Sequence, residues 1–290
     1  MLVLPAVLAA SSASAQVLFQ DTFDRPDAED INASTAGITN NTGTSFGYVE
    51  NFAPDRSDIV GNTLRLANGP GTSNIFVDHN FTDAAILNAG GFSVSFDLTQ
   101  FGSGVGGGFG AGFGIGMSRP EALDTGDAQN GDGSSNDNFK MQDGLQNGGN
   151  QVSDIAVSDF WIVLRQDGFL QFGTRGASLP FDMGTPGPAY LGGGAVFTDP
   201  DFVNTGTVRV DFDLASFDDG ATVGYAVFFN DQPFVADGNG SATGTFTWTG
   251  SNQNYIGLDA RDPAFVGIDN FTISTPVPEP TSLALLRRRK

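Results

Sequence analysis

Strand-length stretches in which apolar and polar residues alternate recur along most of the 290-residue chain, and this pattern restricts its fold more than any other feature. In Phe92–Leu98 and again in Val208–Leu214, every second residue is apolar and the residues between are serine, aspartate or arginine. Successive side chains of a β-strand point to opposite faces of a sheet, so each stretch has one apolar face and one polar face. Both are predicted to be half-buried strands.

Comparable stretches occupy much of the remaining chain. They are Val17–Phe23, Thr63–Leu66, Asn74–Val77, Phe109–Met117, Phe160–Arg165, Phe169–Gly173, Gly224–Phe229, Thr245–Thr249, Tyr255–Ala260 and Val266–Ile273. Turn-forming residues at Gln166–Gly168 and Asn230–Pro233 predict two hairpins. About a dozen short strands with no helical pattern between them favour an all-β fold, an antiparallel two-sheet β-sandwich of the jelly-roll type. A parallel β-helix would need a fixed short repeat, and none is found.

The composition supports this fold class and limits the partners. The chain holds 40 glycines, which supply turn conformations, and 26 phenylalanines, which suit half-buried pleated surfaces. It has no cysteine, so disulfides and thiolate metal sites are excluded and the fold must rest on its core. The net charge is −20, with 29 aspartates against four glutamates. Such an acidic surface repels phosphate backbones, so nucleic-acid binding is not expected.

The C-terminal segment carries a Val-Pro-Glu-Pro motif at Val277–Pro280, an apolar run at Leu283–Leu286 and basic residues at Arg287–Lys290. It resembles the sorting signal of the PEP-CTERM family of exported bacterial proteins, through Pro278, Glu279, Pro280, Arg287, Arg288 and Arg289. The resemblance implies a transient membrane anchor, removed by an exosortase-like protease, and delivery to the cell envelope or extracellular matrix. Crossing a bilayer takes about 20 apolar residues in a helix, so the membrane helix of this tail is missing or shortened.

The N-terminal segment also points to export. Leu2–Ala10 is an apolar stretch of signal-peptide length, and Ala13–Ala15 has the small-x-small pattern after which signal peptidase cuts. No basic residue precedes the apolar stretch, although such signals usually open with one. We therefore expect a signal peptide at residues 1–15, one β-sandwich domain at 16–275 and a sorting tail at 276–290.

Three further segments, Val17–Asp24, Gly224–Phe234 and Ile268–Ile273, resemble strands of concanavalin A-like lectin and glucanase domains, which include laminin G-like modules. The resemblance extends over roughly residues 17 to 274. It implies that the first and last strands pair with each other and that one concave sheet carries a ligand. The activity has to be argued from the residues of a site, because one fold hosts many functions.

The most polar stretch of the chain is Glu121–Asn150, which is rich in aspartate, asparagine and glycine. Calcium binds about six to eight oxygen atoms, and a loop of this composition supplies them, so a Ca²⁺ site is one interpretation. Its candidate ligands are Asp124, Asp127, Asp132 and Asp137. Their spacing does not match an EF-hand, and a solvated loop without metal is the alternative.

Aromatic side chains are the candidates for carbohydrate contacts, because a sugar ring stacks on an exposed aromatic ring while polar groups bind its hydroxyls. The predicted ligand-binding residues are Trp161, Trp248 and Tyr255. Within Thr245–Thr249, alternation puts Phe246 and Trp248 on the same side of a strand. Burial of that side in the core is the alternative for Trp248.

Catalytic sites find less support in the sequence. Retaining glycoside hydrolases need two carboxyl groups about 5 to 5.5 Å apart, yet no two of the four glutamates lie within a strand of each other. The single histidine, His79, follows Asp78, but neighbours in a strand face opposite ways, so we expect a surface or strand-end histidine. Gly102–Gly116 contains G-x-G-x-x-G matches outside a strand–helix context, and we interpret it as a loop that leads into a glycine-rich strand, where another strand or a ligand approaches closely.

Together these features favour an exported, non-catalytic surface or matrix protein that binds extracellular polysaccharide or glycan through a lectin-like β-sandwich. Its other expected partners are signal peptidase and an exosortase-like protease. Two alternatives stay open. One is a structural or adhesive matrix protein that is bridged by calcium and has no sugar specificity. The other is a divergent glycoside hydrolase, which the shortage of glutamate disfavours.

Overall fold

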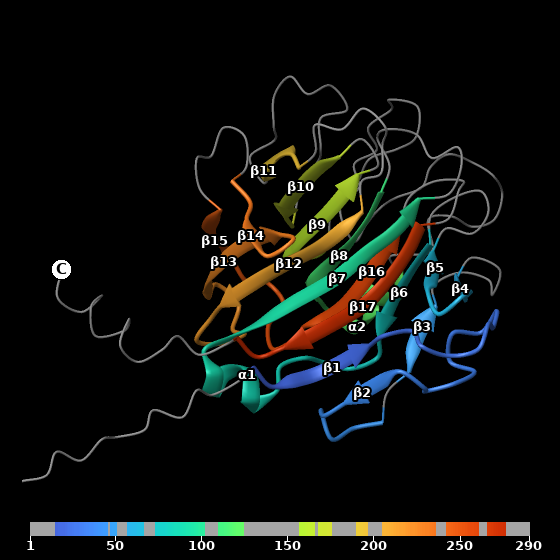
Figure 1. Cartoon of the computed structure of the whole chain (residues 1–290). Coiled ribbons are helices and arrows are strands. Elements are labelled where there is room, and N and C mark those ends of the chain that lie inside the picture. Colours follow the sequence, from blue (N-terminus) through green and yellow to red (C-terminus); the bar gives the residue numbers. More distant parts are fainter. Residues whose placement is uncertain are drawn as a thin grey trace, which may run out of the picture.

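Two antiparallel sheets stacked on each other form the protein, with two short helices beside them (Figure 1). This arrangement confirms the predicted fold class, an antiparallel two-sheet β-sandwich. The structure is a computed structural model, and it describes residues 15–45, 47–50, 57–66, 73–101, 110–124, 157–165, 168–175, 190–196, 205–235, 242–260 and 266–276.

The larger sheet has ten strands among the described residues. Its main path runs in the order β14 (Gln232–Pro233), β13 (Thr222–Phe229), β12 (Gly206–Asp213), β7 (Gly91–Phe101), β17 (Val266–Ser274), β1 (Val17–Asp21) and β2 (Ile38–Asn40). In addition, β13 pairs with β15 (Thr243–Thr247), β17 with β5 (Leu64–Leu66), and β5 with β4 (Ser57–Ile59). Strands β12, β7 and β17 cross the front of the molecule in Figure 1.

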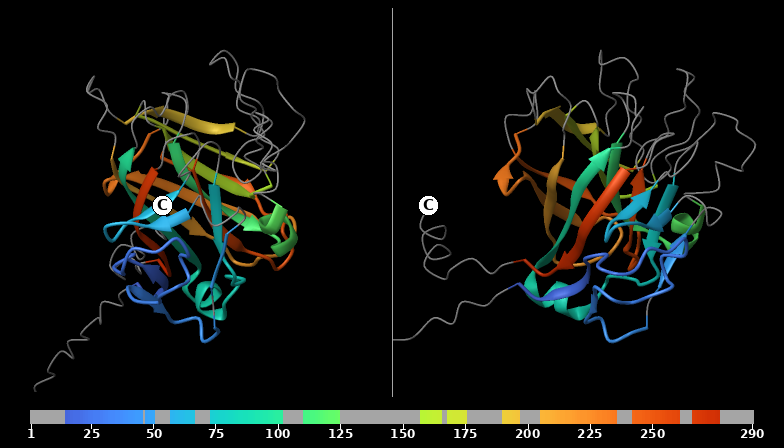
Figure 2. Two further views of the ribbon diagram at one scale, coloured as in Figure 1. Left: turned by 90° about the vertical axis from the view of Figure 1, so that its right-hand side faces the viewer. Right: turned by 45° about the vertical axis from the view of Figure 1, so that its right-hand side comes forward.

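The smaller sheet has seven strands and lies behind the larger one in Figure 1. Its order is β11 (Tyr190–Ala195), β10 (Phe169–Thr174), β9 (Phe160–Arg165), β8 (Gly110–Met117), β16 (Tyr255–Ala260), β6 (Ser73–Val77) and β3 (Tyr48–Glu50). Helix α1 (Ala84–Ala89) precedes β7, and helix α2 (Arg119–Asp124) follows β8. The turned views in Figure 2 show the two layers from other sides.

The hydrophobic core fills the space between the two sheets. Phe96 of β7 meets Phe113 of β8 edge to face, with ring centroids 6.2 Å apart, and so joins one sheet to the other. Within the larger sheet, Phe92 stacks on Phe212 with centroids 4.9 Å apart. The alternation predicted for β7 and β12 is therefore correct, since the apolar residues of both strands are buried and the polar ones point away from the core.

Several short elements were not predicted from the sequence. Strands β2, β3 and β4 have three residues each, which is too short for an alternating pattern to be recognised. Strand β11 contains three successive glycines, which carry no side-chain pattern at all. The two predicted hairpins are present, as β9 with β10 and β13 with β14. In the second hairpin the turn is Asn230–Asp231, both with positive φ, and the strand resumes at Gln232, two residues earlier than predicted.

The first and last strands pair with each other, as the resemblance to concanavalin A-like domains implies. Strand β1 runs antiparallel to β17, with Val17 opposite Ser274. The pairing continues beyond both strands, because the amide of Thr275 donates to the carbonyl of Gln16 at 2.9 Å. The two ends of the described chain therefore lie side by side in the larger sheet.

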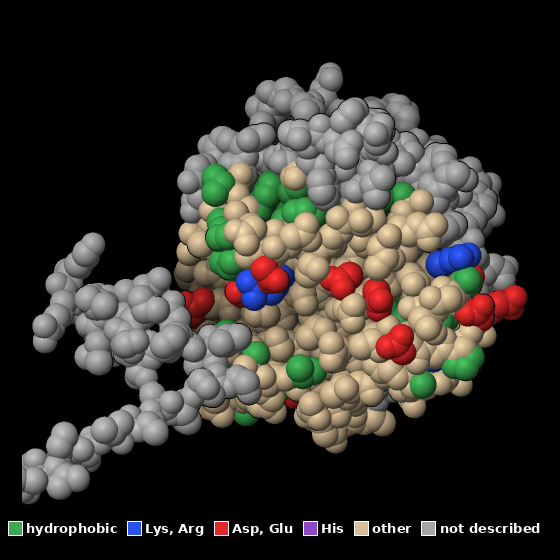
Figure 3. All heavy atoms as spheres, in the orientation of Figure 1, with side chains coloured by type: hydrophobic (Ala, Val, Ile, Leu, Met, Phe, Trp, Pro, Cys, Tyr) green, Lys and Arg blue, Asp and Glu red, His purple; other side chains and the backbone are tan. Residues whose placement is uncertain are grey.

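The face of the larger sheet that points away from the core is polar, and its polar groups bind one another. Ser93 donates to Asp211 at 2.7 Å across β7 and β12, and Arg209 lies over the ring of Phe228 at 4.2 Å from its centroid. Figure 3 shows separate acidic side chains spread over a mostly uncharged surface on this side. This face offers the solvated surface that alternation predicts.

Close approach of strands explains the glycines of β8. A Cβ atom on Gly112 would lie 1.8 Å from the carbonyl oxygen of Ile162 in β9, and one on Gly110 would lie 1.9 Å from that of Leu164. No side chain fits at such a distance, so only glycine allows β8 and β9 to pair this closely. The interpretation of this stretch as a strand that another strand approaches is correct.

We expect Gly112→Ala to destabilise the protein by about 3 kcal/mol, because the backbone of β8 or β9 would have to shift to admit the methyl group. The matched control is Gly224→Ala in β13, where the nearest atom to the added Cβ is 3.5 Å away. Urea unfolding of both variants and the wild type gives the free energies. Equal losses in the two variants would contradict the explanation from close approach.

Candidate functional site

The face of the seven-stranded sheet that points away from the core, called the outer face below, is where the candidate site lies. In β9 the even-numbered residues belong to the core, which puts Trp161 and Val163 on the outer face. In β16 the even-numbered residues again belong to the core, which puts Tyr255, Gly257 and Asp259 on the outer face. Strand β8, between β9 and β16, presents mainly glycine there.

One cross-strand row of the outer face contains three polar residues. Asp259 lies opposite Asn74 of β6 on one side and opposite Gly112 of β8 on the other. The row continues through Val163 of β9 to Gln171 of β10. We call Asn74, Asp259 and Gln171 the polar row. Their exposed fractions are 3%, 0% and 7%, so three polar side chains are buried on a face that does not belong to the sandwich core.

In the polar row, Asp259 is the residue whose burial is least offset by hydrogen bonds or opposite charges. Neither carboxylate oxygen has a hydrogen-bond partner within the described parts of the chain. The flanking strands β6 and β8 contain no charged residue. Burial raises the pKa of Asp259 to about 8, and the backbone amide of Ala260 offsets only part of that shift. At neutral pH this carboxyl is therefore mostly protonated.

Asp259 is not among the predicted site residues, although the sequence carries a signal for it. The alternation in Tyr255–Ala260 predicts that Tyr255 and Asp259 share one face of a strand. What the sequence does not show is that β6 and β8 flank this strand and bring no compensating charge to it.

Trp161 lies on the outer face, but its predicted role as an exposed stacking platform is wrong. The residue is fully buried, and its indole nitrogen donates to the carbonyl of Thr174 at 3.3 Å. In register it stands between Gly114 of β8 and Gly173 of β10. Because neither glycine has a side chain, the large ring has room beside them on the sheet.

Trp248 is a core residue, so its predicted role in ligand binding is also wrong, and the alternative of core burial is correct. It is fully buried, with its ring centroid 5.2 Å from that of Phe217 and 6.3 Å from that of Phe246. Its indole nitrogen donates to the carbonyl of Gly250 at 2.7 Å. Alternation sends both aromatic residues of this segment to the core, because the other side of β15 is polar.

Tyr255 is the predicted platform residue that is partly exposed. It begins β16, and its ring meets Phe76 of β6 edge to face at 6.0 Å. Beside it, Arg119 donates to both oxygens of Asp78, at 2.7 and 2.8 Å. Burial, and then the negative charge of Asp78, raise the pKa of Tyr255. The hydrogen bonds from Arg119 lower the pKa of Asp78, so this ion pair stays charged.

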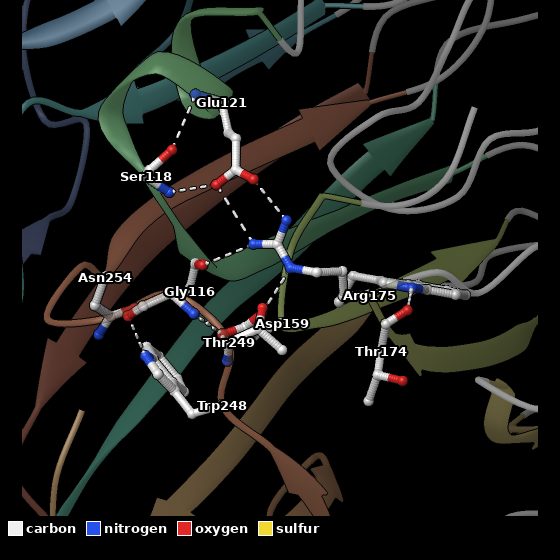
Figure 4. A network of polar contacts seen from close by, with 11 residues as sticks. Gly116, Ser118, Glu121, Asp159, Thr174, Arg175, Trp248, Thr249 and Asn254 are labelled. Carbon is white, nitrogen blue, oxygen red and sulfur yellow. Dashed lines mark hydrogen bonds and ion pairs between the residues drawn. The ribbon is translucent and has the colours of Figure 1, made fainter. Parts of the chain in front are cut away.

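A second polar network closes the end of the outer face near α2 (Figure 4). At its centre, the fully buried Asp159 accepts hydrogen bonds from Arg175 Nε at 2.8 Å and from the amides of Thr249 and Gly250 at 2.8 and 3.0 Å. Arg175 also donates to Glu121 at 2.6 Å. Here every buried charge has a partner of opposite charge, in contrast to Asp259.

Glu121 owes its place to a capping box at the start of α2. The amide of Ser118 donates to Glu121 Oε2 at 2.7 Å, and the amide of Glu121 donates to Ser118 Oγ at 3.3 Å. Burial alone would raise the pKa of Glu121, but the hydrogen bonds from Arg175 and Ser118 hold it below its usual value. This carboxylate is engaged by protein groups.

His79 is the second residue after β6, as predicted for a strand-end histidine. Its Nδ1 lies 3.0 Å from Thr44 Oγ1, and its Nε2 lies 3.1 Å from Asp83 Oδ2. Asp78 binds Arg119 instead, in agreement with the opposite directions of neighbouring residues. The histidine therefore joins two loops at one end of the sandwich.

The remaining predicted site residues fall largely outside the described parts of the chain. These are the calcium ligands Asp127, Asp132 and Asp137 and the sorting residues Pro278, Glu279, Pro280, Arg287, Arg288 and Arg289; of Asp124 only the backbone, at the end of α2, is described. Among the described residues, no group of three His, Cys, Asp or Glu side chains is arranged to hold a metal ion. None of the described helices has the length and apolar character to span a membrane.

No family model and no curated protein matches the chain. Solved structures do resemble it. An endo-1,3-beta-glucanase from Streptomyces sioyaensis has 11% identity and a TM-score of 0.48, over 93% of this chain and 99% of that one. A legume lectin-like domain from Entamoeba histolytica has 9% identity and a TM-score of 0.41, over 78% and 88%. Peanut lectin has 12% identity and a TM-score of 0.36, over 82% and 100%. These likenesses concern the fold alone.

We expect Arg175→Met to lower the free energy of unfolding by about 3 kcal/mol, because it leaves the buried Asp159 without its cation. The matched control is Arg119→Met, which removes a partner of Asp78 in a pair whose side chains are 45% and 33% exposed. Surface ion pairs contribute little, so the melting temperature of the control should stay close to that of the wild type. A loss of equal size in both variants would contradict the importance of the Asp159 site.

The raised pKa of Asp259 predicts how the stability of the protein depends on pH. The folded value of about 8 lies above the unfolded value of 3.8, so between these pH values the folded state binds more protons than the unfolded state. Stability should therefore fall as pH rises through this window, by up to about 1.4 kcal/mol per unit. Urea unfolding from pH 5 to 9 measures this slope. Asp259→Asn should lack this contribution, and parallel curves for variant and wild type would contradict the assignment.

Proposed function

We propose that the protein is a non-catalytic carbohydrate-binding module that takes its ligand on the outer face of the seven-stranded sheet. The observation that supports this most is the polar row, in which Asp259 is fully buried and has no hydrogen-bond partner among the described residues. Buried polar groups nearly always have such partners, so an unpartnered one calls for a ligand or a water molecule. Sugar hydroxyls donate and accept hydrogen bonds, and therefore match a carboxyl that has the amide of Asn74 opposite it on β6 and the amide of Gln171 three strands away in the same row.

Tyr255 supplies a partly exposed aromatic ring on the same face of the same strand. It lies four residues from Asp259, which corresponds to about 13 Å along a strand. A ligand that contacts both residues therefore has to be an oligosaccharide rather than a single sugar. Between them, Gly257 of β16 and Gly114 of β8 stand opposite each other and place no side chain over the sheet. This arrangement supports a polysaccharide chain as the natural ligand.

Asp159 and Asp259 are too far apart for hydrolysis, and the neighbouring carboxyl groups of Asp159 and Glu121 are both held by Arg175, which is why we favour binding. Asp159 precedes Val163 by four residues, and Val163 is two strands away from Asp259. Strand rise and strand spacing then put the Cα atoms of Asp159 and Asp259 roughly 16 Å apart. Inverting glycosidases use carboxyl groups up to about 9.5 Å apart, and retaining ones need a shorter distance. Asp159 is moreover held by Arg175.

We further propose that this module is exported to the cell envelope or the extracellular matrix. The support is the resemblance of Val277–Pro280 and Arg287–Lys290 to a sorting signal, together with the apolar Leu2–Ala10 stretch at the other end. We also propose, from the composition of the segment that contains Asp127 and Asp132, that this segment binds a calcium ion. Calcium would be available to the protein in such a compartment.

A glycan array probed with the full chain, once with calcium and once with EDTA, tests the proposed function. We expect reproducible binding to one glycan class, and loss of at least tenfold in affinity for Asp259→Leu. That variant should be at least as stable as the wild type, because an apolar side chain of similar size replaces an unpaired buried carboxyl. Loss of binding in EDTA would place a cation in or near the site.

The control for this experiment is Asp213→Asn, on the exposed end of β12 in the other sheet, which should bind like the wild type. A blank array in both buffers would refute carbohydrate binding and favour a structural matrix protein. Unchanged binding by Asp259→Leu would move the site away from the outer face.

A further inference from the structure

We infer that the ligand of the outer face is a neutral glycan. A hydrogen bond donated by one of its hydroxyl groups takes the place of the proton on Asp259, so that binding releases this proton to solvent. The inference rests on the proposed function and adds to it the charge class of the sugar and the pH dependence of its binding.

The unliganded site holds a neutral carboxyl because burial disfavours the charge more than the backbone amide of Ala260 favours it. Asp259 is fully buried, and its oxygens have no hydrogen-bond partner in the described parts of the chain. Its neighbours in the sheet, β6 and β8, carry no titratable side chain, and on β16 itself the other titratable group is Tyr255. An isolated carboxylate in such surroundings takes up a proton instead of remaining charged. The pKa of about 8 agrees with this protonation state.

Helix α2 also packs against β16, and its described charged side chains are already paired. Arg119 holds Asp78 through two hydrogen bonds, and Glu121 is held by Arg175. Both pairs belong to the end of the outer face where β16 begins, whereas Asp259 lies near the other end of that strand. These charges therefore do not serve Asp259 as counter-ions.

A bound sugar changes this balance by bringing hydroxyl donors to the carboxyl oxygens. Hydrogen bonds to an ionised acceptor are roughly twice as strong as those between neutral groups, so donors of this kind favour the carboxylate over the acid. They lower the pKa of the carboxyl in the complex below that of the free site. At a pH between the pKa of the complex and the pKa of the free site, the proton leaves as the sugar binds. In this range the affinity for the sugar rises with pH.

The same carboxylate discriminates against acidic sugars. A uronic acid placed over the polar row would bring a second negative charge to a buried site, and like charges at short range repel strongly there. Three arginines lie on or near this face: Arg119 pairs with Asp78, Arg175 pairs with Asp159 and Glu121, and Arg165 at the end of β9 lies over the ring of Phe169, 5.7 Å from its centroid. The net charge of −20 repels anionic polysaccharides at longer range as well. Neutral hexose polymers fit this environment.

The test is isothermal titration calorimetry of the full chain with two matched sets of probes. One set consists of hexasaccharides of glucose, mannose and galactose, and the other of hexasaccharides of the corresponding uronic acids. Each probe is titrated at pH 6 and pH 8, in two buffers with different ionisation enthalpies. We expect a neutral hexasaccharide to bind at least about tenfold more tightly at pH 8 than at pH 6, with a buffer-dependent heat that reports proton release.

Two variants make the assignment specific. Asp259→Asn should lose the pH dependence and the buffer-dependent heat, and Asp213→Asn should keep both. Neutral-sugar binding with equal affinity at both pH values would overturn the inference and leave the proposed function standing, as would tighter binding of the uronic acids. Absence of binding to every probe at both pH values would refute the proposed function and this inference together.

Discussion

The layer of apolar side chains between the two sheets determines where every other residue of the strands points. Because side chains alternate along a strand, fixing Ile256 and Leu258 in the core leaves Asp259 only the outer face. The same rule turns Trp161 outward and Trp248 inward, although both are tryptophans in strand-rich segments. A one-residue change of register would reverse these assignments, so the packing of the core specifies the candidate site as well as the fold.

Two buried aspartates on the smaller sheet illustrate two ways of accommodating a carboxyl in a protein interior. Asp159 is surrounded by donors, namely Arg175 and the amides of Thr249 and Gly250, so its charged form has partners. Asp259 has no such donor among the described residues, and protonation takes the place of a partner. The first arrangement stabilises a structure, because the hydrogen bonds and the ion pair fix several chain segments. The second leaves a group whose hydrogen-bonding capacity is unused, which is what a binding site requires.

Local sequence patterns were sufficient for the fold but insufficient for the site. Alternation and turn residues gave the β-sandwich, the hairpin of β9 with β10 and the polar face of β12, since each depends on neighbours in sequence. The burial of Trp161 depends on Gly114 and Gly173, which stand beside it only because three strands pair in one register. The network around Arg175 likewise joins residues 54 positions apart in the chain. Such contacts have no local signature, which is why the sequence predicts exposed rings at Trp161 and Trp248 where the structure has buried ones.

An unpaired buried carboxyl lowers stability, so its presence has to be compensated elsewhere in the molecule. The chain has no disulfide to supply that stability, but it has a continuous core and close strand pairing at Gly110 and Gly112. Fixed strands on both sides hold Asp259 in place, so the position of the carboxyl would not have to be ordered by the ligand proposed for the outer face. Places where a sequence breaks the local rules of a stable interior are, in natural proteins, commonly places of function. In the described parts of the smaller sheet, Asp259 breaks those rules most clearly, and this is the physical reason to seek the ligand above it.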